Sequence, residues 1–90
     1  MTASAEATGE AMLVRVEFTI EPFHDAAPGI HVQAALAAVT GLGLAPEMGP
    51  FGTSIVATEL LAVAAVTAVT AAALANGATR VSVQVERLAR

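Results

Sequence analysis

Several residue types are missing from this chain, and their absence narrows what it can do. The 90 residues include no cysteine, tryptophan, tyrosine or lysine. Without cysteine there is no disulfide, no thiolate metal ligand and no cysteine nucleophile. The only strong cations are Arg15, Arg80, Arg87 and Arg90, which form no basic stripe and are not interleaved with aromatic residues. The chain therefore lacks a surface that could neutralise phosphates or stack on bases, and nucleic acid is not an expected partner.

Charged residues are also scarce, whereas apolar residues are abundant for so short a chain. Hydrophobic residues make up 56% of the sequence, charged residues 13%, and the mean hydropathy is +0.70. A domain of this size buries only about 60 to 65% of its unfolded surface, so a monomer would leave apolar surface exposed. Because large apolar patches are usually interfaces, we expect a homodimer or homotetramer.

The first eleven residues, 1–11, are small and polar and include Glu6 and Glu10. We expect a disordered leader there, followed by a single domain over 12–90. The leader has acidic residues and no basic segment ahead of an apolar run. A cytoplasmic protein is therefore expected.

One apolar stretch, 55–75, could be mistaken for a membrane span. It contains a single charged residue, Glu59, and matches the length of about 20 residues that a span needs. Its apolar character comes largely from alanine and threonine, and no cluster of basic residues or aromatic belt flanks it. We therefore expect a buried helix of a soluble protein, with no membrane partner.

Alternation of apolar and polar residues predicts the strands. The pattern over 14–21 and 80–87 indicates two strands that each have one buried face. Shorter strands are expected at 44–48 and 53–57, on either side of a turn at 49–50 that consists of glycine and proline.

Helical spacing predicts two helices, over 30–40 and 59–75. Gly41 and Gly43 are expected to end the first helix, and Asn76 with Gly77 to supply a left-handed stop for the second. Thr58 is the expected N-cap of the second helix. The outer side of this second helix is expected to pack on another helix, because it is filled with small residues: Ala64, Ala65, Thr67, Ala68, Ala71 and Ala72.

The order strand, helix, strand, strand, helix, strand favours an α+β fold of the ferredoxin-like βαββαβ type. Right-handed crossovers give an antiparallel sheet in the order 4-1-3-2, with both helices on one face. The other face is left uncovered, free for solvent, a ligand or a second sheet. It carries Arg15, Glu17, Thr19, Ser82, Gln84 and Glu86.

Patterns that indicate catalysis or metal binding are weak. His24 and Asp25 are adjacent in a loop, but with His31 as the only other histidine a metal site lacks ligands. We interpret His24 as a loop residue held by local hydrogen bonds and expect His31 to be exposed. Ser54 has no neighbouring base. The sequence predicts no catalytic residue, no metal site, no cofactor and no enzymatic activity.

Three segments, in this order and with these intervals, resemble the small YkoF-like thiamine-binding proteins. They are 16–22 (VEFTIEP), 49–54 (GPFGTS) and 77–81 (GATRV), and the resemblance covers about 12–88. It implies a ferredoxin-like domain that associates through its sheets into dimers or tetramers. It also implies binding of thiamine, or of its pyrimidine portion, without chemical conversion.

A thiamine site needs fixed donors and acceptors for the aminopyrimidine and negative charge for the cationic ring. Thr53, Ser54 and Glu47 offer the first, Glu17 or Glu21 the second, and Phe51 a flat apolar wall. The predicted ligand-binding residues are Glu17, Thr19, Glu47, Phe51, Thr53 and Ser54.

Two other interpretations stay open. Thr53 and Ser54 can be ordinary strand residues, with Glu47 a solvated charge and Phe51 in the core. The family that the chain resembles commonly has acidic residues soon after the glycine-threonine-serine segment, and Val56 stands at one of those positions. The alternative function is a structural or regulatory oligomeric domain of the same fold that has lost its ligand.

Overall fold

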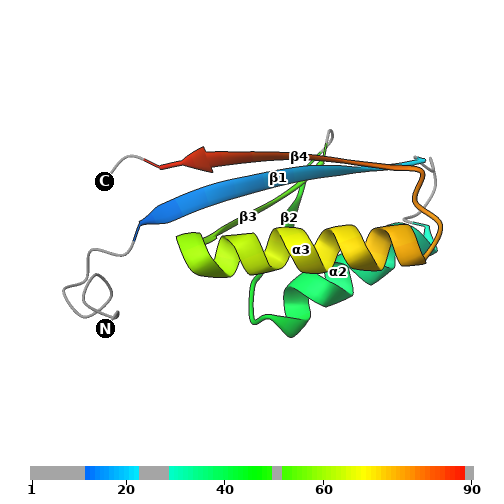
Figure 1. The fold of residues 1–90 in the computed structure, drawn as a ribbon, viewed down its shortest axis with the longest axis horizontal. Coiled ribbons are helices and arrows are strands. Elements are labelled where there is room, and N and C mark those ends of the chain that lie inside the picture. The colour runs from blue at the N-terminus through cyan, green and yellow to red at the C-terminus, as the bar shows by residue number, and fades with distance from the viewer. Residues whose placement is uncertain (1–11, 23–28, 50–51, 89–90) are drawn as a thin grey trace.

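A four-stranded sheet and two helices packed on one of its faces form the two layers of the molecule (Figure 1). The computed structural model describes residues 12–22, 29–49 and 52–88. The antiparallel strands lie in the order β2-β3-β1-β4, so the predicted ferredoxin-like βαββαβ fold and its 4-1-3-2 order are confirmed. In chain order the elements are β1 (Leu13–Glu21), α2 (Ile30–Gly41), β2 (Glu47–Met48), β3 (Thr53–Thr58), α3 (Glu59–Ala75) and β4 (Arg80–Arg87).

Three of the predictions fall on parts of the chain outside the described residues. These are the leader over 1–11, the adjacent His24 and Asp25, and the aromatic wall at Phe51.

The central strand β1 pairs with β3 on one side and with β4 on the other. Its alternate residues Val14, Val16, Phe18 and Ile20 are buried against the helices, as the period of two predicts. The residues between them face the uncovered side of the sheet. The long alternating strand therefore carries both the core and the centre of the exposed polar face.

The helices contribute mostly small side chains to the core. In α3 the buried residues Ala62, Ala65, Val69 and Ala73 follow helical spacing along one side. The predicted outer position of Ala65 is therefore wrong, because it lies on the stripe that meets the core. Within the described residues, no helix combines the length and the apolar composition needed to cross a membrane.

His31, which was expected to be exposed, is 4% exposed. Its Nε2 lies 2.7 Å from the carbonyl oxygen of Pro22. Because a carbonyl only accepts, the ring N–H donates this bond. The interaction fastens the first turn of α2 to the residue after β1, and burial of the imidazole follows from this structural role.

The element ends follow the sequence signals in part. Gly43 and Gly77 have φ angles of 82° and 102°, in the left-handed region that glycine tolerates. Thr58 occupies the N-cap position of α3, but its side chain makes no capping hydrogen bond. The edge strand β2 is shorter than predicted, and it begins directly after Pro46. Proline has no N–H to donate to the ladder, which accounts for the shortening.

Candidate ligand-binding site

The uncovered face of the sheet carries a row of polar side chains that crosses all four strands. In the pairing register, Gln84 of β4 lies opposite Glu17 of β1, Glu17 opposite Ser54 of β3, and Ser54 opposite Glu47 of β2. Neighbouring members of such a row have Cβ atoms about 4.5 to 5.5 Å apart. We call Gln84, Glu17, Ser54 and Glu47 the polar row.

A hollow of about 570 Å³ lies over this row. A volume of this size falls within the range of about 300 to 1,000 Å³ that is typical of small-molecule sites. It brings together five of the six predicted ligand-binding residues: Glu17, Thr19, Glu47, Thr53 and Ser54. The other described residues that line it are Met48, Gly49, Gly52, Ser82, Val83 and Gln84.

Thr53 takes a different position from its neighbour Ser54. It is only 7% exposed and alternates in β3 with the buried Ile55 and Ala57. Its side chain therefore belongs to the face that the helices cover, and little of Thr53 is accessible from the hollow. Ser54, one residue later, lies on the uncovered face between two glutamates.

The β2–β3 hairpin forms one end of the hollow. Gly49 N–H donates a hydrogen bond to the Gly52 carbonyl at 2.7 Å and closes the turn. A Cβ built on Gly52 would lie 2.8 Å from the carbonyl oxygen of Phe18 and 3.1 Å from Oγ1 of Thr19. Glycine is required there because the hairpin approaches β1 more closely than a side chain allows.

Negative charge is concentrated along the polar row. Glu17 and Glu47 are separated by two strand spacings, roughly 10 Å, with the Ser54 hydroxyl between them. Arg15 lies two residues from Glu17 along β1, opposite Glu86 of β4. The hollow therefore has two carboxylates on its own walls, and in the adjacent row Arg15 lies opposite Glu86.

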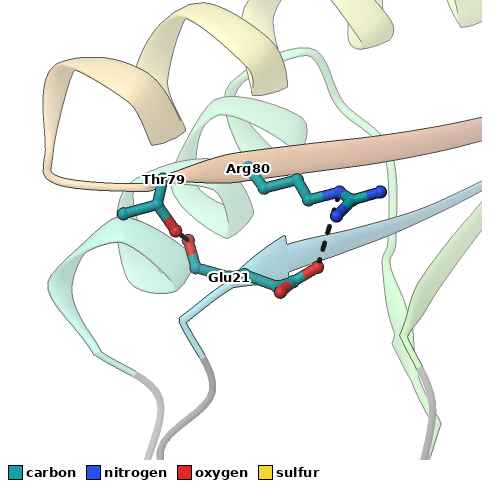
Figure 2. A network of polar contacts seen from close by, with 3 residues as sticks. All are labelled: Glu21, Thr79 and Arg80. Carbon is teal, nitrogen blue, oxygen red and sulfur yellow. Dashed lines mark hydrogen bonds and ion pairs between the residues drawn. The ribbon is translucent and has the colours of Figure 1, made fainter.

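Glu21, the other predicted source of negative charge, lies away from the hollow. Figure 2 shows it beside Thr79 and Arg80, where β1 ends and β4 begins. Its carbonyl accepts hydrogen bonds from the Thr79 N–H at 2.8 Å and from Thr79 Oγ1 at 3.3 Å, and its Oε2 lies 3.9 Å from Arg80 Nε. Glu21 therefore ties the two strands together and does not contribute to the site.

Sequence reasoning placed Ser82 and Gln84 on the uncovered face but did not select them for the site. Gln84 adds both a donor and an acceptor directly opposite Glu17. The exposed Met48 adds apolar surface at the hairpin. The alternation of β4 predicts that Gln84 lies on the uncovered face. That it lies opposite Glu17 depends on how β4 pairs with β1, and those two strands are far apart in the sequence.

A second hollow, of about 510 Å³, adjoins the first and shares Glu17, Glu47 and Ser54 with it. Arg15, Pro46 and other residues line its far side. The shared residues make one continuous polar surface. Among the described residues, no group of three or more potential ligands could hold a metal ion. This surface offers hydrogen bonds to a polar ring and attraction to a cation.

Comparison with solved structures reveals close likenesses in fold. A domain of unknown function, DUF77, from Bacillus cereus has a TM-score of 0.65 and 20% identity, over 89% of this chain and 78% of that one. A hypothetical protein from Methanocaldococcus jannascii has a TM-score of 0.63 and 22% identity, over 87% and 80%. A Thermotoga maritima protein, provisionally named for thiamine biosynthesis or salvage, has a TM-score of 0.63 and 18% identity, over 87% and 84%.

No protein-family model matches the chain, and no curated protein sequence is significantly similar to it. The likenesses extend over most of the chain in each case, and at 18 to 22% identity they bear on the fold. At that level they confirm the ferredoxin-like fold that the resemblance of the three sequence segments implies.

Proposed function

We propose that this chain is a non-enzymatic binding protein for thiamine, or for its hydroxymethylpyrimidine portion, and that it acts as a homo-oligomer. The observation that carries the proposal is the polar row, in which Gln84, Glu17, Ser54 and Glu47 lie side by side under one hollow. The name of the Thermotoga maritima structure supports the same direction.

The polar row suits the two parts of thiamine. An aminopyrimidine needs both donors and acceptors, which the Gln84 amide and the Ser54 hydroxyl supply together. The thiazolium ring carries a positive charge, which Glu17 or Glu47 would attract. The two strand spacings between Glu17 and Glu47, roughly 10 Å of sheet, leave room for a ring above Ser54.

We propose binding without conversion, and the kinds of side chain that line the hollow support it. They are carboxylates, hydroxyls, one amide and apolar groups, with no histidine among the described lining residues. Ser54 lies between two carboxylates in the register and has no imidazole beside it in the row. The site is equipped to hold and orient a ligand, so we propose no catalytic residue.

Calorimetric titration tests this function. The unmodified protein is expected to bind thiamine saturably. Glu17→Gln and Glu47→Gln are expected to weaken binding about tenfold, because a hydrogen bond to a charged group contributes about 1.5 to 3 kcal/mol. The matched control is Glu86→Gln, which removes an exposed carboxylate from the same face outside the hollow. Its affinity should stay within about twofold.

A second ligand separates charge from hydrogen bonding. Hydroxymethylpyrimidine lacks the cationic ring, so a glutamate that acts through charge should affect thiamine more than the pyrimidine. Equal loss for both ligands would assign that glutamate to the pyrimidine instead. Absence of any heat with either ligand would contradict the proposed function.

The alternative, an oligomeric structural or regulatory domain without ligand, is favoured by Val56. This valine is half exposed on the uncovered face and lies opposite Arg15. An apolar residue in that position suits contact with another protein surface better than contact with a cation. A well-defined oligomer that gives no heat with thiamine would support this alternative.

A further inference from the structure

Three kinds of polar side chain follow one another along the uncovered face of β1. Thr19, Glu17 and Arg15 alternate with the buried residues of this strand and therefore share its other face. Each lies roughly 7 Å from the next, because two residues separate them along the strand. A hydroxyl, a carboxylate and a guanidinium thus form a line that crosses the polar row at Glu17.

The two hollows on this face divide the line between them. Thr19 and Glu17 line the first hollow, whereas Glu17 and Arg15 line the second. Glu17, Ser54 and Glu47 belong to both. We call the two hollows together the trough. Its middle is acidic, and its arginine lies toward one end.

The guanidinium of Arg15 is exposed and available to a ligand. Within the described part of the chain, the ion pairs involve Arg80 and Arg87. Arg15 takes part in neither pair, although Glu86 lies opposite it in the register. A guanidinium presents a fork of N–H donors that matches the oxygens of a phosphate group. Arg15 therefore has its donors available for an anion.

Apolar side chains accompany Arg15 at this end of the trough. Val56 lies opposite it on β3 and is 50% exposed. Leu44 and Pro46, from the segment that leads into β2, also line the second hollow. Such side chains suit contact with an aliphatic chain. This end of the trough thus combines one cation with an apolar wall.

We propose that the second hollow takes a phosphate group, so that the preferred ligand of the trough is a phosphate monoester of thiamine. This inference rests on the proposed function and names its ligand class. The aminopyrimidine lies toward Thr19, the thiazolium at Glu17 and the phosphate at Arg15. The ethyl chain that joins thiazolium to phosphate spans about one spacing of roughly 7 Å when extended. The order of groups in the ligand then matches the order of side chains along β1.

Charge selects this orientation. The ester carries a positive ring next to a phosphate with a charge of about −1.5 to −2 at pH 7, and the trough carries carboxylates next to a guanidinium. In the reversed orientation the phosphate would lie in the first hollow, where Glu17 and Glu47 are the charged groups among the described lining residues. The two carboxylates would repel it there. Inorganic phosphate lacks the positive ring and should also bind poorly for this reason.

Calorimetric titration of thiamine and thiamine monophosphate, side by side, tests the inference. The unmodified protein is expected to bind the monophosphate about fivefold to tenfold more tightly than thiamine. In Arg15→Gln this preference should disappear, because the neutral amide lacks both the charge and the fork. Arg80→Gln is the matched control, since Arg80 lines neither hollow, and it should keep the preference. Circular dichroism confirms that each variant is folded.

Two further arms separate charge from the general binding of anions. Arg15→Lys keeps the charge but loses the planar fork, so it should retain part of the preference for the monophosphate. Inorganic phosphate is titrated alone and should bind at least tenfold more weakly than the monophosphate. Amide chemical shifts locate the added group: the monophosphate should shift the amides of Arg15 and Val56 beyond the changes that thiamine produces.

Thiamine binding with no preference for the monophosphate would overturn this inference and leave the proposed function standing. A preference that survives Arg15→Gln would also overturn it. Inorganic phosphate that binds as tightly as the monophosphate would indicate a general anion site, which contradicts the assignment to a thiamine ester. Absence of heat with both thiamine and the monophosphate would overturn the inference and the proposed function together.

Discussion

At the scale of single residues, Gly52 shows how a contact with the backbone shapes the candidate site. The hairpin lies so close beside β1 that a methyl group on Gly52 would meet the Phe18 carbonyl oxygen. Gly49, in the same turn, has more room, since a Cβ built on it would lie 3.5 Å from the Gly52 carbonyl oxygen, an ordinary contact distance. The two glycines of this turn therefore differ in whether they could be replaced by a residue with a side chain, and the sequence alone could not show this difference.

Gly52→Ala is expected to lower the free energy of unfolding by about 1 to 3 kcal/mol, because main-chain atoms must move to admit the methyl group. Gly49→Ala is the matched control and should change stability by less than about 1 kcal/mol. Urea denaturation of both variants measures the difference. Equal stability of the two would mean that the hairpin does not approach β1 as described.

At the scale of elements, α3 packs its core through alanine more than through large side chains. Its bounds follow from the sequence, since Glu59 opens the helix and Gly77 follows its end. Which alanines are buried does not follow, because neighbouring alanines look alike in a hydrophobic pattern. Ala65 is buried and Ala64 is exposed, and only the position of the sheet distinguishes them.

Ala65→Leu is expected to destabilise the fold by about 1 to 3 kcal/mol, because the core around it is already filled. For a chain of this size, each kcal/mol corresponds to a fall of about 4 to 8 °C in melting temperature. Ala64→Leu adds the same atoms to the exposed side and should leave the melting temperature almost unchanged. Thermal denaturation followed by circular dichroism decides between them, and similar melting temperatures would contradict the assigned faces.

Strands β1, β3 and β4 and the two helices were predictable because their patterns are periodic. The short β2 was harder to predict. A two-residue strand shows no alternation, and Pro46, just before it, keeps the strand from extending. His31 was misjudged for a related reason: its burial depends on the Pro22 carbonyl, which the chain brings to it from β1. Local patterns therefore identify elements, and contacts between elements require the structure.

At the scale of the whole molecule, the candidate site is a product of strand register. Glu17, Ser54 and Glu47 were chosen from the sequence one by one, and the sheet brings them into a single row. Gln84 was not chosen because it joins the row only through pairing of β4 with β1.

Mapping of thiamine by amide chemical shifts, on isotope-labelled protein, tests most directly whether the polar row is the ligand site. Titration is expected to shift the amides of Glu17, Thr19, Ser54 and Gln84, while the amides of α2 and α3 stay in place. The change in chemical shift should level off at one bound thiamine for each protein chain. Unchanged spectra at saturating thiamine, or shifts confined to α2 and α3, would contradict a ligand on the uncovered face.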